Sequence, residues 1–358
     1  MTKIVRFTEI DLMRFLAAVC VMLFHYTFRG YASDHMTVIW FPALAWIFKY
    51  GYMGVEFFFM ISGFVILMTA MDKSPREFLI SRMVRLFPVF WVCVSITYLV
   101  MYFWGGARYR AIPELYFTNL TMIYGFFRFN SVDSVYWTLL LEIKFYLLIF
   151  LIMIFGQIRY IKYYLGLWLL ASLPLFPHAR PFLENYFITG YSSFFIAGAV
   201  FYLIYKEGNS PYLLGLASVS YLLSLGQGID RTLFFGKMFH TVYNPYVMMV
   251  LTTLIFLSFF LISQKKTASW RSDRYLLIGG LTYPVYLLHS NIGFIIFNNL
   301  HTFVNHYILL GGTSALIIYL SYLIHTKAEK NMAASLKKNL EYLLRVKPRT
   351  HQGHTRQL

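Results

Sequence analysis

The chain has 358 residues, of which 59% are hydrophobic and only 13% are charged. Soluble globular proteins carry about 25% charged residues, so this composition excludes that class and predicts a polytopic membrane protein. The net charge of +16 does not indicate nucleic-acid binding, because the basic residues cluster between apolar segments. The two cysteines, Cys20 and Cys93, lie in apolar segments and predict neither a disulfide framework nor a metal site.

Apolar segments long enough to cross a membrane recur along the chain. A spanning helix needs about 20 mostly apolar residues. Ten segments are candidates: 12–28, 50–70, 86–104, 136–155, 162–177, 186–205, 211–227, 243–263, 276–298 and 303–325. We expect Pro174 and Pro177 to end the fifth early, and Gly226 and Gly228 to end the seventh. The predicted fold is an all-α integral membrane protein with about ten transmembrane helices around a central cavity.

The connections predict the orientation in the membrane. With the N-terminus inside, 21 lysines and arginines fall on the inner side and eight on the outer side, so both termini are expected in the cytoplasm. No small-residue cleavage site precedes the first span, which is therefore expected to be retained. The longest outer connection, 105–135, is expected to form short helices. We divide the chain into a membrane domain, 1–326, and a cytoplasmic region, 327–358, in which 327–346 forms an amphipathic helix on the inner leaflet before a disordered basic tail.

The first span contains Arg14 and His25. Eleven residues at about 100° per residue place both side chains on one helical face, about 16 Å apart along the axis. We therefore expect His25 near the bilayer midplane, above Arg14. Ionisable groups inside a membrane usually belong to a substrate path or a reaction site. The alternative is a snorkelling arginine and a core histidine bonded to a neighbouring helix.

The second span opens with GYMGVEFFFMISGF, in which polar and small residues interrupt an aromatic helix. Gly51 and Gly54 allow close backbone approach near the membrane surface. Glu56 lies a few residues inside, and Ser62 lies about two turns further along. These residues form either part of a polar site or a packing motif with one partnered carboxylate.

The third span begins with SRMVRLFP, where Arg82 and Arg85 are three residues apart and share a helical face. Two guanidinium groups on one face suit bidentate binding of phosphate oxygens. The alternative is a topology signal that also contacts lipid phosphates.

Two later spans carry further polar groups. Glu142 lies within the fourth span, one turn before Tyr146, and needs a partner or a proton at that depth. Lys144 is two residues away and points elsewhere on a helix. The ninth span contains LTYPVYLLH, with Tyr283, Tyr286 and His289 on one face. Tyrosines alone suit an interfacial belt, but a histidine on the same face favours a lined cavity.

In order along the chain, these segments resemble acyltransferase family 3, a family of membrane O-acyltransferases. The resemblance covers about 10–325 and is carried by DLMRFLAAVCVMLFH, GVEFFFMISGF, SRMVRLFP, WTLLLEIKFY and TYPVYLLH, with Asp11, Arg14 and His25 in the first. Glu56 stands where an aspartate is expected, and Glu142 is followed by Ile143 and Lys144 where a second polar or acidic residue is common. The chain is similar to the stand-alone form, without an appended esterase-like domain.

The resemblance implies transfer of an acyl group, usually acetyl, from cytoplasmic acyl-CoA to a sugar hydroxyl. The acceptor would be an envelope polysaccharide or lipid-linked oligosaccharide of O-antigen or exopolysaccharide type, in the bacterial inner membrane among membrane lipids. His25 would act as base or acyl relay, oriented by Glu142, and no metal takes part. The remaining residues would bind donor (Arg14, Arg82, Arg85, Ser62), bind the sugar (Trp137, Tyr146, Tyr283, Tyr286, His289) or support the site (Asp11, Glu56).

Two other functions use similar residues. A proton-coupled secondary transporter also buries Arg, His, Glu and Tyr, and ten spans is a common size for it. The sequence has no internal repeat and no paired broken helices, which argues against a transporter. A flippase for a glycan or lipid, without covalent chemistry, is the remaining alternative. Hydrolysis or exchange of acetyl-CoA by the purified protein would separate the enzyme from both.

Overall fold

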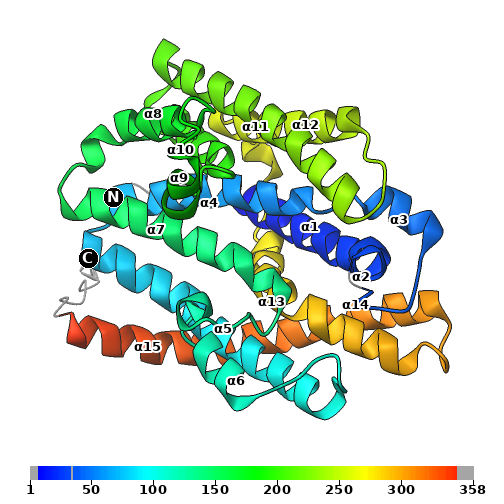
Figure 1. Ribbon diagram of the computed structural model, residues 1–358. Coiled ribbons are helices and arrows are strands. Elements are labelled where there is room, and N and C mark those ends of the chain that lie inside the picture. Colours follow the sequence, from blue (N-terminus) through cyan, green and yellow to red (C-terminus); the bar gives the residue numbers. More distant parts are fainter. Residues whose placement is uncertain (1–6, 34, 345–358) are drawn as a thin grey trace.

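The computed structural model describes residues 7–33 and 35–344, and every regular element in these ranges is a helix (Figure 1). The first half comprises α1 (Thr8–Phe24), the π-helical turn η1 (His25–Arg29), α2 (Gly30–Ala32), α3 (Pro42–Phe48), α4 (Met53–Asp72), α5 (Pro75–Trp104), α6 (Pro113–Asn119), η2 (Tyr124–Phe127), η3 (Ser134–Tyr136) and α7 (Trp137–Ile154). The second half comprises η4 (Ile158–Tyr160), α8 (Ile161–Ser172), α9 (Arg180–Phe187), α10 (Ser192–Glu207), α11 (Pro211–Met238), α12 (Pro245–Ser263), η5 (Ala268–Trp270), α13 (Arg274–Leu300), α14 (His306–Leu323), η6 (Ile324–Glu329) and α15 (Lys330–Leu343).

The number of spans is smaller than the ten expected from the sequence. By length and composition, seven helices of the described residues can cross a membrane, or eight if α9 and α10, which meet at 51°, form one bent span. The predicted fifth span fails because α8 ends at Ser172, before Pro174, after only 12 residues. The predicted ninth corresponds to α13, which is long enough, but its polar residues lower its mean hydropathy. The short helices α6, η2 and η3 confirm the expectation for the connection 105–135.

Helix α13 can be polar because it is the buried centre of the bundle. Its residues from Gly279 to Phe297 are almost all buried, and it packs between α1, α5 and α14. A helix surrounded by protein meets little lipid, so hydrogen-bonding groups on it can be satisfied by other helices. The polar stripe predicted for this segment therefore faces neighbouring helices.

The closest helix crossing lies between α4 and α10. A Cβ atom added to Gly63 would lie 2.0 Å from the carbonyl oxygen of Phe195, and one added to Gly198 would lie 1.9 Å from that of Met60. Small residues at both positions let the two backbones touch, which is the usual basis of helix association in lipid. The rings of Phe59 and Phe195 stack beside this crossing, with centroids 4.7 Å apart. This contact fixes the position of α4, which carries several candidate site residues.

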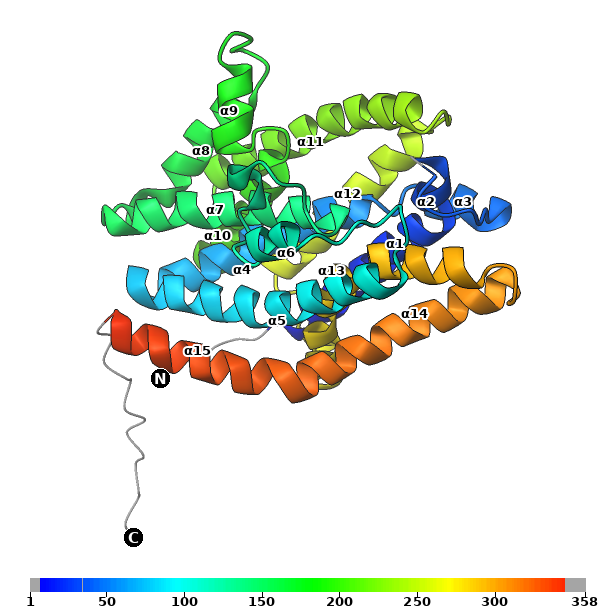
Figure 2. The ribbon, with the colours of Figure 1, turned by 60° about the horizontal axis from the view of Figure 1, so that its bottom comes forward.

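Two boundaries differ from the predictions. Helix α11 does not end at Gly226 or Gly228 but continues to Met238, and Gly228 allows Met248 of α12 to approach. The expected amphipathic helix at 327–346 is formed in its described part, but it continues α14 through η6 and packs along α5 (Figures 1 and 2). It is therefore not a separate helix lying on the leaflet. The end of the predicted helix and the predicted disordered tail, from residue 345, lie outside the described residues.

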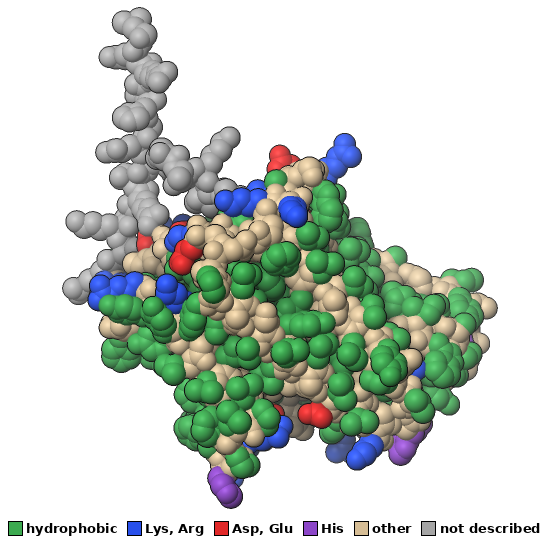
Figure 3. All heavy atoms as spheres, turned by 90° about the horizontal axis from the view of Figure 1, so that it is seen from above, with side chains coloured by type: hydrophobic (Ala, Val, Ile, Leu, Met, Phe, Trp, Pro, Cys, Tyr) green, Lys and Arg blue, Asp and Glu red, His purple; other side chains and the backbone are tan. Residues whose placement is uncertain are grey.

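The surface agrees with a membrane protein. Figure 3 shows a face covered mainly by hydrophobic side chains, with charged side chains gathered toward its edges. Exposed hydrophobic residues on α11 and α12 include Leu222, Phe234, Val250 and Leu254. Apolar surface of this extent is what lipid tails cover.

Candidate active site

A cavity of about 210 Å³ lies among α1, α4, α5, α7 and α13. Eight of the residues singled out in the sequence line it: Arg14, Ser62, Arg82, Arg85, Glu142, Tyr146, Tyr283 and Tyr286. They come from five helices that are distant in sequence. The helical faces predicted from spacing therefore converge on one cavity.

Glu142 is the carboxylate of this cavity. Its Oε1 atom accepts a hydrogen bond of 2.8 Å from Ser62 Oγ and another from the hydroxyl of Tyr146. Lys144 points away, as predicted, and donates to the carbonyl oxygen of Asn185 at 2.5 Å. No hydrogen bond joins Glu142 to His25 in the described part of the chain. The expected orientation of His25 by Glu142 is thus not formed, because the carboxylate is directed at Ser62 and Tyr146.

Three arginines surround Glu142 and make the cavity electropositive. Arg14 lies 3.5 Å from Asp11, and Arg85 forms a 3.0 Å ion pair with Glu329. Arg82 donates to Ser81 Oγ at 2.9 Å, and its buried Nε atom has no hydrogen-bond partner among the described residues. With three guanidinium groups and one carboxylate in the lining, the cavity has a formal charge of +2. Such a site favours an anion, and a buried donor without a partner is costly until one arrives.

A second cavity of about 640 Å³ adjoins the first. Arg14 and Arg85 line both cavities, and the second is completed by residues of α1, α13, η6 and α15 that include Asp11, His325, Glu329 and Lys330. Glu329 accepts from Arg85 through one carboxylate oxygen and contacts His325 Nδ1 at 2.6 Å through the other. The C-terminal helix is therefore part of this cavity, which the sequence did not predict.

His25 is buried against His289 of α13. Nε2 of His289 lies 3.2 Å from Nδ1 of His25, and that Nδ1 also lies 2.8 Å from the carbonyl oxygen of Val21. Nδ1 of His289 lies 2.8 Å from the carbonyl oxygen of Tyr286. Carbonyl oxygens only accept, so both Nδ1 atoms carry the proton when the rings are neutral. The single Nδ1 proton of His25 is then shared between the carbonyl oxygen of Val21 and Nε2 of His289, and the Nε2 atom of His25 is left as a proton acceptor with no hydrogen bond to any described residue.

Tyr286 connects the cavity to the histidine pair. It lines the cavity, its hydroxyl lies 2.9 Å from Thr138 Oγ1, and its ring centroid is 5.7 Å from that of His289. His25 itself is not among the lining residues. It lies five residues past the middle of the span Thr8–Ala32, which is about 8 Å along the helix axis toward Ala32.

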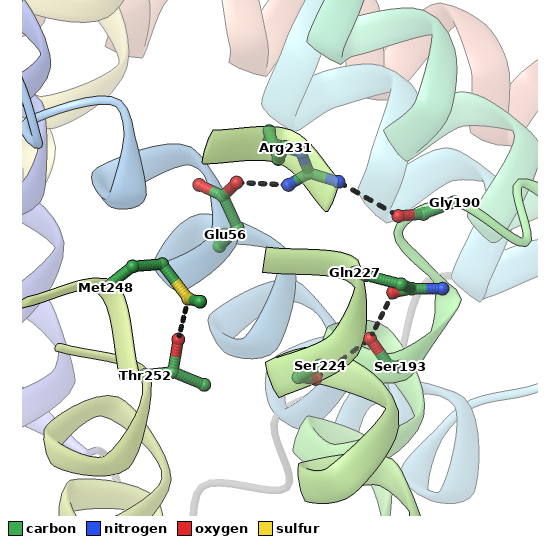
Figure 4. A network of polar contacts seen from close by, with 8 residues as sticks. All are labelled: Glu56, Gly190, Ser193, Ser224, Gln227, Arg231, Met248 and Thr252. Carbon is green, nitrogen blue, oxygen red and sulfur yellow. Dashed lines mark hydrogen bonds and ion pairs between the residues drawn. The ribbon is translucent and has the colours of Figure 1, made fainter. Parts of the chain in front are cut away.

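Three predicted residues lie elsewhere. Trp137 packs against Tyr191, with ring centroids 5.4 Å apart, and does not line the cavity. Asp11 lines the second cavity beside Arg14. Glu56 forms a buried ion pair with Arg231 of α11 (Figure 4). Arg231, which the charge count places in an outer loop, therefore lies within a helix and serves another site.

Comparison with known proteins shows the family of the chain. The model of a family described as an acyltransferase domain matches residues 7–326. Nodulation protein 10 of Rhizobium leguminosarum bv. viciae is 28% identical over 156 residues, which cover 38% of this chain and 41% of the relative. The match therefore spans less than half of that relative's length. No solved structure matches the chain.

Proposed function

Because the chain belongs to acyltransferase family 3, whose model covers residues 7–326, we propose that it transfers an acetyl group from cytoplasmic acetyl-CoA to a hydroxyl of an envelope glycan. The acceptor would be a polysaccharide or lipid-linked sugar of O-antigen or exopolysaccharide type. We place the protein in the bacterial inner membrane with both termini in the cytoplasm, which the distribution of lysine and arginine supports.

The pair of adjoining cavities is the observation that carries this proposal. Sites for ligands of moderate size occupy about 300–1,000 Å³, so the 210 Å³ cavity is too small for a whole nucleotide, whereas the 640 Å³ cavity is not. The polyanionic head of acetyl-CoA would lie in the larger cavity against Arg14, Arg85 and Lys330. Its thin arm would pass between Arg14 and Arg85 into the smaller cavity, where Arg82 has an unpartnered Nε.

The proposed reaction takes place where the arm of acetyl-CoA would end in the smaller cavity. The thioester would reach the Tyr286 end of the smaller cavity, next to the histidine pair. The acceptor oxygen attacks the thioester carbon, the new C–O bond forms, and the C–S bond breaks. Nε2 of His25 accepts the proton of the attacking hydroxyl and returns it to the departing sulfur, so charge and protons balance. Nε2 of His289 accepts a hydrogen bond from Nδ1 of His25 and so stabilises the imidazolium that forms, which is the role first assigned to Glu142.

The test uses the purified full chain in lipid nanodiscs. His25→Ala is expected to lower transfer of labelled acetyl from acetyl-CoA to extracted envelope glycan by about a hundredfold or more, without weakening acetyl-CoA binding. His306→Ala, at an exposed histidine of α14, is the matched control and should keep full activity. Normal transfer by His25→Ala would refute this mechanism.

A second arm addresses the donor site. Arg82→Ala is expected to weaken acetyl-CoA binding by about tenfold or more, because charge-assisted hydrogen bonds contribute about 1.5–3 kcal/mol each. Arg82→Lys should recover only part of the affinity, since the planar guanidinium fork is lost. If the affinity for acetyl-CoA were unchanged in Arg82→Ala, Arg82 would be interpreted only as a topology signal. The acceptor class is checked separately by glycan analysis of a deletion strain and a complemented strain.

A further inference from the structure

A third cavity, of about 570 Å³, lies on the expected outer side of the molecule. It is formed by the end of α8, the α8–α9 connection, α9, the start of α10 and the second half of α11. Its charged and amide-bearing lining residues are Arg180, Glu184, Gln227, Asp230 and Arg231. None of the residues predicted from the sequence lines it, and the mechanism above does not use it.

Hydrogen bonds from α11 hold one wall of this cavity in place (Figure 4). Arg231 is paired with Glu56 and donates to the carbonyl oxygen of Gly190 at 3.0 Å. Gln227 donates to the carbonyl oxygen of Thr189 at 2.9 Å. These carbonyls belong to the break between α9 and α10, which no helical N–H satisfies. Side chains that satisfy a break in a membrane span give a rigid polar surface suited to ligand binding.

The charge of this cavity differs from that of the smaller, 210 Å³ cavity, which we call the donor cavity. Two guanidinium groups, Arg180 and Arg231, and two carboxylates, Glu184 and Asp230, line it, and Arg231 is already paired with the buried Glu56, so the cavity has no excess positive charge. A balanced set of donors and acceptors suits an uncharged polyol better than a polyanion. Tyr191 adds an aromatic ring, which the Arg231 guanidinium covers at 4.0 Å from the centroid. This mixture of hydroxyl-binding groups and ring surface fits a sugar.

One layer of aromatic rings separates this cavity from the donor cavity. Tyr191 lines the outer cavity, Phe59 lines the donor cavity, and their ring centroids are 5.2 Å apart. Trp137 packs on the same pair, with centroids 5.4 Å from Tyr191 and 6.5 Å from Phe59. Tyr191 belongs to the break next to α10, so the two cavities are neighbours through the contact between its ring and that of Phe59. The position of the cavity therefore matches that of a second substrate.

We propose that this cavity binds the uncharged glycosyl unit that accepts the acyl group. The inference rests on the proposed function and moves acceptor binding away from Tyr146, Tyr283, Tyr286 and His289. Leu222 and Phe234, 64% and 61% exposed, lie at the edge of the cavity, where a lipid carrier or a free glycan can both be accommodated. Both sources, the lipid-linked glycan and the free glycan, would present the same uncharged sugar to the cavity.

The kinetic test uses two exposed lining residues, whose replacement should leave the fold intact: Glu184 and Asp230. Glu184→Gln combined with Asp230→Asn is expected to raise the KM for the glycan at least tenfold and to leave the KM for acetyl-CoA unchanged. Glu207→Gln, an exposed carboxylate at the opposite end of α10, is the control. An unchanged KM for the glycan in the double variant would overturn the proposal. Delipidated glycan and intact lipid-linked glycan, tested separately, distinguish the two sources.

A binding test separates this inference from the proposed function. Asp230→Cys in a Cys20→Ser background places an accessible thiol in the cavity, since the other cysteine, Cys93, is buried. Without acetyl-CoA, extracted glycan is expected to slow labelling by a membrane-impermeant maleimide at least fivefold. Protection without any acetyl transfer would refute the proposed function but support the sugar site. Absence of protection would refute the sugar site, whether or not transfer occurs.

Discussion

A methyl group at the α4–α10 crossing is expected to destabilise the protein and impair the reaction. The Cβ atom of Gly198→Ala would lie 1.9 Å from the carbonyl oxygen of Met60, whereas real Cβ contacts below 3.0 Å essentially do not occur. The helices must therefore separate locally by about 1 Å. Overpacking of this kind costs about 1–3 kcal/mol. Because α4 carries Phe59 and Ser62, the same shift would displace two residues that line the donor cavity.

Thermal unfolding in detergent, followed by tryptophan fluorescence, measures the effect. A loss of 1–3 kcal/mol lowers Tm by several degrees, at about 2–4 °C per kcal/mol for a large domain. Gly215→Ala on α11 is the control, because its Cβ atom would meet nothing within 4 Å. We expect Gly198→Ala to lose both Tm and acetyl transfer, and Gly215→Ala to keep both. Equal midpoints for the two variants would show that the helices do not touch at Gly198.

Three further predictions concern the site. Glu329→Gln is expected to tighten acetyl-CoA binding severalfold, because Arg85 loses its ion-pair partner and becomes free to bind phosphate. Calorimetric titration measures the affinity, and weaker binding would contradict the prediction. Glu142→Gln should lower turnover without weakening acetyl-CoA binding, since the carboxylate holds Ser62 and Tyr146 in the lining of the smaller cavity and lies away from the larger cavity proposed for the phosphates; weaker binding would assign Glu142 to the donor instead. His289→Gln should lower kcat about tenfold with little change in either KM and shift the pH profile of kcat, while a purely structural role would lower Tm and leave that profile unchanged.

The sequence predicted that these residues would converge on one cavity because they repeat at helical spacing. Arg82 and Arg85, or Glu142 and Tyr146, share a face by geometry that a single helix determines. Each face carries polar groups that lipid cannot solvate, so the faces had to meet inside the bundle. Convergence of these helices on one cavity was therefore predictable without knowledge of how the helices are ordered around it.

Spacing within one helix could not predict which side chains of different helices contact one another. His25 could be assigned a depth, but nothing local to α1 indicates that His289 rather than Glu142 is its partner. Glu56 and Arg231 are 175 residues apart and meet only because α4 and α11 both pack on α10. The only signal in the sequence was that an intramembrane carboxylate needs a cation somewhere. The count of ten spans failed because α8 ends after 12 residues, and because α13 is surrounded by protein and does not need an apolar exterior.

Under the proposed function, the continuous helix from His306 to Leu343 sets the depth at which the donor would enter. Its 38 residues extend about 57 Å, more than the roughly 40–45 Å of a bilayer with its headgroups. If His306 marks the outer edge of the hydrocarbon, Glu329 lies about 35 Å below it, in the inner headgroup layer. The mouth of the larger cavity is then level with the phosphates of the lipids. Anionic lipid headgroups should compete with acetyl-CoA for Arg85, which makes the apparent donor affinity depend on the phospholipid composition of the inner leaflet.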